Sequence, residues 1–214
     1  MKRIIDISLS ISNNTLIWPG DPEVSIKKTK NISDDGFAVS EIHVGSHCAT
    51  HIDAPSHFIE NGKSIDLLDL SIFIGTCLVI DFCTLNRPIT STDIEKKLLE
   101  LNTSVPERLI LKTRVNSSKE FFNTTNQLGI NKDAAVFLVS NGCKLVCIDL
   151  PSIEPSTSDM EVHKHLLKSE TIIMESVNLT NVDQGHYTLV SLPLKLYDTD
   201  ASPCRAILVP SSYY

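Results

Sequence analysis

The chain has 214 residues, of which 42% are hydrophobic and 21% are charged, which is ordinary for a globular protein. Its formal net charge of −7 argues against nucleic acid or an anionic membrane as a partner. No hydrophobic run approaches the roughly 20 residues of a membrane span, and Lys2, Arg3 and Asp6 interrupt the N-terminus too early for a signal peptide.

Six cysteines are present without any Cys-x2-Cys spacing, and several of them lie in hydrophobic runs. This pattern is typical of reduced core residues in a cytoplasmic protein. The length suits one domain with a sizeable core, and no linker composition divides it. We therefore expect a cytoplasmic protein with a single domain over residues 1–214.

The first part of the chain alternates in hydrophobicity from Ile5 to Ile11, which predicts a half-buried strand. The segment Trp18-Pro19-Gly20-Asp21-Pro22 then requires a turn. Residues 38–43 are predicted to form the strand that leads into a histidine-rich segment. We interpret His43, just before that segment, as a structural histidine or one that orients a neighbouring ligand.

Residues 46–58 read Ser-His-Cys-Ala-Thr-His-Ile-Asp-Ala-Pro-Ser-His-Phe and hold three of the seven histidines. A single histidine is usually a surface residue or a hydrogen-bonded core residue, but such clustering favours a metal. His47, His51 and Asp53 suit a borderline divalent ion such as zinc or manganese, and no cysteine pair closes the site. Because Pro55 disfavours helix at the residue before it, we expect these ligands on a strand end or loop.

The rest of the chain predicts more strands than helices, without regular βαβ alternation. Strands are predicted at residues 74–82, 108–112, 144–150, 171–177, 187–196 and 205–209. Thr92-x-x-Glu95 predicts the start of one helix, and residues 132–140 form another that ends at Asn141-Gly142. The polar residues 116–126 are expected to be a loop, with a flap over the site as one interpretation.

A further helix is predicted to begin at Ser158-x-x-Glu161 and to carry His163 and His165. These two histidines cannot both face the core, because residues two apart on a helix lie about 200° apart. His163 shares the probable core face of Leu166 and Leu167. Glu175 lies in a hydrophobic strand, where a carboxylate requires a cation or hydrogen-bond donors, so it is either a metal ligand or part of an ion pair.

The segment His47-x-Ala49-Thr50-His51-x-Asp53-x-Pro55-x-His57 resembles the His-x-Gly-Thr-His-x-Asp-x-Pro-x-His signature of the cyclase/kynurenine formamidase family of metal-dependent amidohydrolases. Further matches are Trp-Pro-Gly-Asp at residues 18–21, Ile-Asp-Leu-Pro-Ser at 148–152 and Asp-Ala-Ser-Pro-Cys-Arg at 200–205. The resemblance covers nearly the whole chain. It implies an α/β fold, the single-domain swivelling β/β/α fold built around a mixed sheet.

The resemblance also implies a set of metal ligands. His47, His51 and Asp53 would hold a first ion, and Asp53, His163 and Glu175 would hold a second. Zinc is the expected metal and manganese the alternative, with one or two ions per subunit. Relatives are commonly dimers, so we expect a homo-oligomer, either a dimer or a tetramer.

The other implied roles concern catalysis and substrate. His57 would be the proton shuttle, since an imidazole can both accept and return a proton near neutral pH; orienting Asp53 is the alternative. Trp18 would contact the substrate, and packing in the core is the alternative. The segment from Asp200 to Arg205 is expected to be a structural turn held by an Asp–Arg pair.

The activity that the resemblance implies is hydrolysis of a small aryl formamide such as N-formylkynurenine by metal-activated water. Ala49 and Ala201 replace glycines of the family pattern, and Leu150 replaces a threonine. Alanine does not freely adopt positive φ, so we expect the local backbone to differ at these positions. A cyclic amide such as isatin, a lactone, or a cyclase or dehydratase reaction is therefore an alternative, and a non-catalytic metal-binding protein is a third class that His57 argues against.

Overall fold

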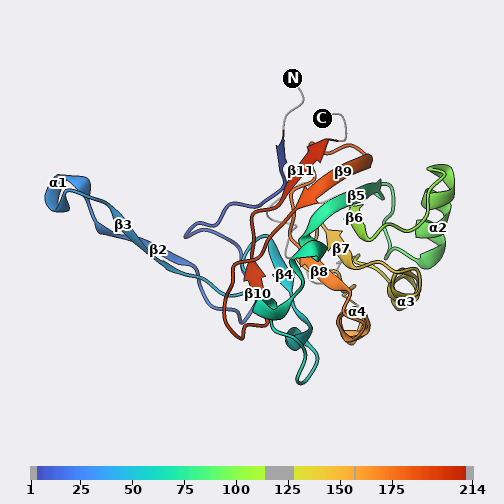
Figure 1. Cartoon of the computed structure of the whole chain (residues 1–214), viewed down its shortest axis with the longest axis horizontal. Coiled ribbons are helices and arrows are strands. Elements are labelled where there is room, and N and C mark those ends of the chain that lie inside the picture. The colour runs from blue at the N-terminus through green and yellow to red at the C-terminus, as the bar shows by residue number, and fades with distance from the viewer. Residues whose placement is uncertain (1–3, 114–127, 157, 211–214) are drawn as a thin grey trace.

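The computed structural model describes residues 4–113, 128–156 and 158–210 (Figure 1). Its main sheet contains β1 (Ile5–Asp6), β4 (His51–Asp53), β5 (Ile74–Asp81), β6 (Arg108–Lys112), β7 (Leu145–Ile148), β8 (Ile172–Glu175), β9 (Gly185–Val190), β10 (Ala201–Pro203) and β11 (Ile207–Pro210). These nine strands are ordered β1-β11-β9-β5-β6-β7-β8-β4-β10. The central strands β5, β6, β7 and β8 run parallel, and the pairings outside them are antiparallel. The expectation of an α/β fold around a mixed sheet is confirmed.

Successive residues of the central strands point to opposite faces of the sheet, and both faces are buried. On β6, Leu109 and Leu111 pack into one core cluster, whereas Ile110 between them packs into the other. The helices α2 (Ser91–Glu100), α3 (Lys132–Ser140) and α4 (Glu161–Lys168) lie together along one side of the sheet (Figure 1). Their apolar faces complete the first cluster, as the continuous apolar runs predict.

Two helix starts differ from the predicted ones. Helix α2 begins after Thr90, whose hydroxyl accepts from the backbone amide of Asp93 while the Asp93 carboxylate accepts from the amide of Thr90. The capping pair is therefore Thr90 and Asp93, two positions before the predicted pair of Thr92 and Glu95. Helix α4 begins at Glu161, not at Ser158, with Met160 in a left-handed conformation before it. Helix α3 has the predicted bounds.

The second sheet is a hairpin of β2 (Ser25–Lys30) and β3 (Val39–His43), with the short helix α1 (Ile32–Asp35) at its tip. It projects far from the main body (Figure 1). The predicted strand at residues 38–43 that leads into the histidine motif is confirmed as β3, which pairs with β2 outside the main sheet. Strand β2 was not predicted, because the sequence Ser-Ile-Lys-Lys-Thr-Lys lacks the alternation of a half-buried strand. Every residue of β3 is exposed.

The connections around the site are short 3-10 helices at Pro55–His57, Ile65–Leu67 and Leu70–Phe73. Among the described residues, no helix combines the length and the apolar character that crossing a bilayer requires. All six cysteines are free, as expected. Residues 116–126, for which a loop or flap was expected, lie outside the described part of the chain.

Candidate metal centre

The register of three neighbouring strands gathers the polar residues of the site. Strand β4 lies between β8 and β10, and its pairing with β8 places His51 directly opposite Glu175. Its pairing with β10 places Asp53 opposite Ala201. Because β4 is only three residues long, the chain leaves the sheet immediately on either side of the motif. The predicted location on a strand end and its loops is confirmed.

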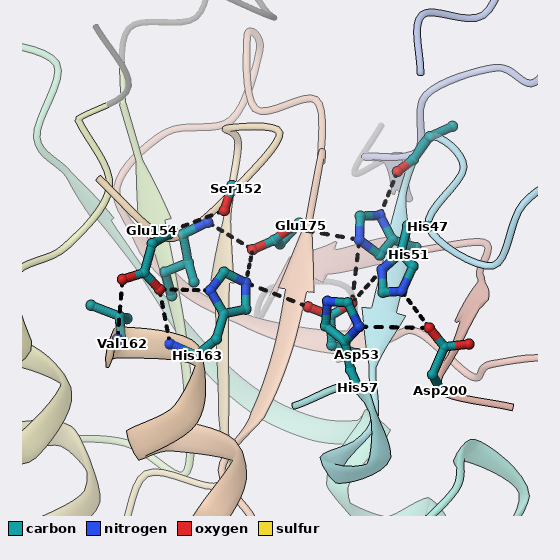
Figure 2. Close-up of polar contacts among 12 residues, drawn as sticks. His47, His51, Asp53, His57, Ser152, Glu154, Val162, His163, Glu175 and Asp200 are labelled. Carbon is teal, nitrogen blue, oxygen red and sulfur yellow. Dashed lines mark hydrogen bonds and ion pairs between the residues drawn. The ribbon is translucent and has the colours of Figure 1, made fainter. Parts of the chain in front are cut away.

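The Asp53 carboxylate lies at the centre of the cluster and is 1% exposed (Figure 2). Its Oδ1 atom lies 3.0 Å from Nδ1 of His47 and 3.3 Å from Nε2 of His51. Its Oδ2 atom lies 3.8 Å from Nε2 of His163. Neither oxygen accepts a hydrogen bond within the described residues. A buried carboxylate in this state needs a cation, so the donor set fits a divalent metal.

Glu175 faces the same space from strand β8. Its Oε2 atom lies 3.6 Å from Nε2 of His51, and its Oε1 atom lies 3.2 Å from Nε2 of His163. Oε1 also accepts a hydrogen bond of 2.7 Å from the backbone amide of Ile153. Glu175 thus reaches two histidines with its two oxygens, as a bridging carboxylate would. His163 faces inward as predicted, whereas His165 lies on another face of α4.

Among the described residues, two groups of three have ligand atoms that all lie within 4.8 Å of one another. One is His51, Asp53 and Glu175, and the other is His47, Asp53 and His57. The structure therefore brings together all six residues for which a metal or catalytic role was expected. His57 lies close enough to be a ligand, and His163 falls outside both tight groups.

The carboxylates control the protonation of the histidines. Burial opposes the charged form of His47, but Asp200 and Asp53 outweigh it and raise the pKa of His47 to about 10. Burial likewise opposes the charged form of His163, and Glu154 and Glu175 raise the pKa of His163 to about 10. Burial would raise the pKa of Asp53, yet His47 and His51 hold it well below its ordinary value. With no ion bound, protons on these histidines supply the positive charge beside the carboxylates, and a bound cation would displace them.

Asp200, which was expected to pair with Arg205, belongs to this centre instead. Its Oδ2 atom lies 2.7 Å from Nε2 of His47 and 3.6 Å from Nδ1 of His57, while Arg205 pairs with Asp6 at 2.6 Å. The predicted pair is wrong because Asp200 immediately precedes β10, beside Ala54, whose amide donates to the Asp200 carbonyl. The sequence offered the acidic residue but no sign of which partner the strand register would bring to it.

Glu154 is a buried contributor that the sequence did not reveal. Its carboxylate accepts from Nδ1 of His163 at 2.7 Å and from the backbone amides of His163 and Val162 at 3.0 and 3.2 Å. The hydroxyl of Ser158 also donates to it. Burial opposes ionisation, but His163, Ser158 and the amides lower the pKa of Glu154 to about 2. Glu154 lies in the connection between β7 and α4, several residues before the helix that it caps, so no local pattern marked it.

A cavity of about 530 Å³ opens over the cluster. Its walls are largely apolar and include Leu9, Leu16, Trp18, Phe58, Met160, Val177 and Leu179. His47, His51, His57, His163 and Glu175 lie on the same cavity. Trp18 therefore lines the same cavity as these polar residues.

Three other residues that the sequence singled out lie at or near the site or on the hairpin. Ala49 adopts φ of 55°, the left-handed conformation that a glycine favours. Ala201 lies within strand β10, where alanine is ordinary. His43 is exposed on the hairpin, opposite Ser25.

Comparison with known proteins gives one consistent family. The family model described as "Putative cyclase" matches residues 5–155. A kynurenine formamidase of Bacillus cereus is 36% identical over 210 residues, covering 96% of this chain and 97% of the relative. A kynurenine formamidase of Salinibacter ruber is 34% identical over 208 residues, covering 96% of each chain.

Solved structures agree on the fold. One described as a potential metal-dependent hydrolase with cyclase activity has a TM-score of 0.79 and 30% identity, with 96% of both chains covered. An isatin hydrolase bound to the product analogue thioisatinate has a TM-score of 0.85 at 22% identity, covering 97% of this chain and 92% of that one.

Proposed function

The chain belongs to the cyclase family that includes metal-dependent hydrolases, and on this premise we propose that it hydrolyses the C–N bond of an aryl formamide such as N-formylkynurenine. The substrate would place the protein in tryptophan catabolism. The reaction class follows from the family and from the geometry of the centre.

The observation that carries the proposal is the state of the Asp53 carboxylate. Both oxygens are buried and accept no hydrogen bond among the described residues, while three imidazole nitrogens face them. We assign His47, His51 and Asp53 to a first ion, and Asp53, His163 and Glu175 to a second. Zinc suits this nitrogen and oxygen donor set, with manganese as the alternative.

When bound, the ions would supply Lewis acidity that polarises a carbonyl and makes water nucleophilic near neutral pH. The residues of the chain then divide the remaining work. His57 lies on the cavity with its Nδ1 atom 3.6 Å from Asp200, which keeps its ring facing the centre. In this position His57 takes a proton from the attacking water and returns it to the leaving amine.

The cavity supports an aromatic substrate. Its volume of about 530 Å³ falls within the range of small-molecule sites. The walls of Trp18, Phe58 and apolar side chains suit stacking and burial of an aryl ring, while the polar floor faces the scissile bond. We assign Trp18 to substrate contact.

The test is N-formylkynurenine hydrolysis by the purified protein, with bound metal counted before and after chelation. We expect turnover that disappears with the metal and returns with zinc or manganese. Metal without N-formylkynurenine turnover would contradict the substrate, and isatin and lactones would be assayed next. Turnover without uptake of water would indicate the cyclase or dehydratase alternative. A protein that retains no metal at neutral pH would contradict the proposal itself.

We further propose a cytoplasmic homo-oligomer, a dimer or tetramer, in which each chain forms one domain over residues 1–214. The projecting hairpin supports self-association because an isolated two-stranded sheet is marginally stable in water. It exposes Ile32 and Ile42 at 72% and 64%, with Phe37 at 56%. A second copy that packs on the hairpin would bury this apolar surface.

A further inference from the structure

The carboxylate of Glu154 connects the second half of the proposed centre to the start of helix α4. It is 3% exposed, and both of its oxygens are used. Oε1 accepts from Ser158 and from the amide of Val162, and Oε2 accepts from the amide and from Nδ1 of His163. One side chain therefore caps the helix and holds the ring that the helix carries (Figure 2).

The contact determines which nitrogen of His163 faces the cluster. An ionised carboxylate only accepts hydrogen bonds, so Nδ1 must carry a proton. Nε2 is then left directed at Oε1 of Glu175, at 3.2 Å, and at Oδ2 of Asp53, at 3.8 Å. A histidine ligand that gives its second N–H to a carboxylate is fixed in tautomer and orientation, and it becomes a more basic donor.

The same short segment also holds Glu175, which is assigned with His163 to the second ion. The amide of Ile153, next to Glu154, donates to Oε1 of Glu175 at 2.7 Å. The segment is held in turn by Ser152, whose hydroxyl accepts from the amide of Glu154 at 3.1 Å. The amide of Ile130 donates to the carbonyl of Ile153 at 2.9 Å. Residues 152–154 thus form a rigid support behind His163 and Glu175.

We propose that Glu154 is a positioning residue that orients His163 toward the second ion and determines whether that ion is retained. The inference rests on the two-ion centre proposed above. It concerns the protein's own residues, so ion binding tests it without any substrate. Loss of such a partner lowers metal affinity by about 10–100-fold.

The experiment counts zinc per chain by native mass spectrometry and measures zinc affinity by calorimetric titration. We expect wild type to bind two ions, and His163→Ala to bind only the first. Glu154→Ala should still bind the second ion, with its affinity lowered about 10–100-fold and the first unchanged, a smaller loss than that of His163→Ala. Glu154→Gln, which can still accept from Nδ1, should lie between Glu154→Ala and wild type.

Two control variants separate orientation of His163 from helix stability. Ser158→Ala removes a donor to the same carboxylate but not the contact with His163. Lys164→Gly weakens α4 at an exposed position without touching Glu154. Both should keep two ions, although Lys164→Gly should lower the melting temperature of the metal-free protein.

Three outcomes would overturn the inference. Glu154→Ala with wild-type affinity for both ions would refute the role of Glu154 and leave the proposed function intact. Equal loss of the second ion in Lys164→Gly would reduce the effect to helix stability. A wild-type protein that binds one ion would refute the two-ion centre on which the inference depends.

Discussion

The Oδ2 atom of Asp200 lies 2.7 Å from the Nε2 atom of His47, the residue that opens the histidine motif. The other ring nitrogen of His47 faces Asp53 at 3.0 Å. His47 is therefore held between two carboxylates, one at the centre of the cluster and one at its edge. Because the same Asp200 oxygen lies 3.6 Å from His57, it relates a proposed ligand to the proposed proton shuttle.

Asp200→Ala should lower kcat by about 10–100-fold with little change in KM, because His47 loses a hydrogen-bond partner and His57 loses a neighbouring carboxylate. Steady-state kinetics with metal-saturated protein would measure this. Asp200→Asn, which retains an acceptor oxygen, should recover part of the activity. Ser46→Ala removes a donor at 3.2 Å to the other Asp200 oxygen and is the matched control. A kcat as low in Ser46→Ala as in Asp200→Ala would contradict the role of Asp200.

His57→Ala should keep its metal but lose about 10²–10⁴-fold in turnover, the usual contribution of a general acid–base group. Asp53→Ala should lose both metal and turnover, because its two oxygens are central to the cluster. Metal counts after dialysis distinguish the two variants. If His57→Ala loses an ion, His57 is a ligand, as its position within 4.8 Å of His47 and Asp53 permits. Retained metal in Asp53→Ala would refute the bridging assignment.

Asp149 should give the free energy of unfolding a distinctive pH dependence. Its carboxylate accepts from the amide of Thr113 at 2.9 and 3.0 Å and from the Thr113 hydroxyl at 2.6 Å. Burial nevertheless dominates and raises the pKa of Asp149 from 3.8 to about 7. Between these values the folded state holds a proton that the unfolded state has released. The contribution of Asp149 to stability is therefore greatest at low pH and falls as pH rises toward 7.

Asp149→Asn carries no such proton and should remove this part of the dependence. Each pH unit in the window corresponds to about 1.4 kcal/mol. Urea denaturation of the metal-free proteins at pH 4.5, 6 and 7.5 would measure the difference, with the variant gaining on wild type as pH rises. An unchanged difference across the three pH values would contradict the raised pKa.

Local patterns predicted those parts of the fold that local physics determines. The apolar run of β6 (Arg108–Lys112) and the amphipathic helix α3 (Lys132–Ser140) have the expected bounds. Strand β2 was missed because its side chains face solvent on both sides of a two-stranded sheet, so no periodic burial marks its sequence. The start of α4 was misplaced because the carboxylate of Glu154, which lies several residues before the helix, accepts from its first amides in place of Ser158.

The sequence predicted those residues of the centre that lie close together along the chain. His47, His51, Asp53 and His57 stand in one segment, and helical periodicity selected His163 over His165. Asp200 could not be assigned, since it reaches His47 only through the pairing of β10 with β4. Such contacts depend on strand register across long stretches of chain, which a single sequence does not specify.

The hairpin should control self-association. We expect light scattering to find a dimer or tetramer for wild type, and a smaller species for Ile42→Lys, because a charge on β3 opposes burial of the hairpin. Leu99→Lys is the matched control, since Leu99 is an 80% exposed apolar residue on α2, away from the hairpin. Loss of assembly in the control alone, or a monomeric wild type, would contradict the assignment of the hairpin to the interface.

Ala49→Gly should change the free energy of unfolding by less than about 1 kcal/mol. Ala49 has φ of 55°, and relief of this left-handed conformation contributes roughly 1–2 kcal/mol. The lost burial of its methyl group, about 0.8 kcal/mol, and the added freedom of glycine in the unfolded chain offset that gain. This conformation has a use: the Ala49 carbonyl lies 2.9 Å from Nδ1 of His51, which leaves Nε2 directed at Asp53 and Glu175.

Glycine adopts the same φ without strain, so Ala49→Gly should also keep its metal and its turnover. Ala54→Gly is the control for the loss of a buried methyl group at ordinary backbone, since Ala54 has φ of −90° and is fully buried. It should be destabilised by about 1–2 kcal/mol through lost burial and added chain entropy. Urea denaturation of the metal-free variants measures both changes. Destabilisation of Ala49→Gly by as much as Ala54→Gly would mean that the centre, and not the conformation of residue 49, requires the methyl group.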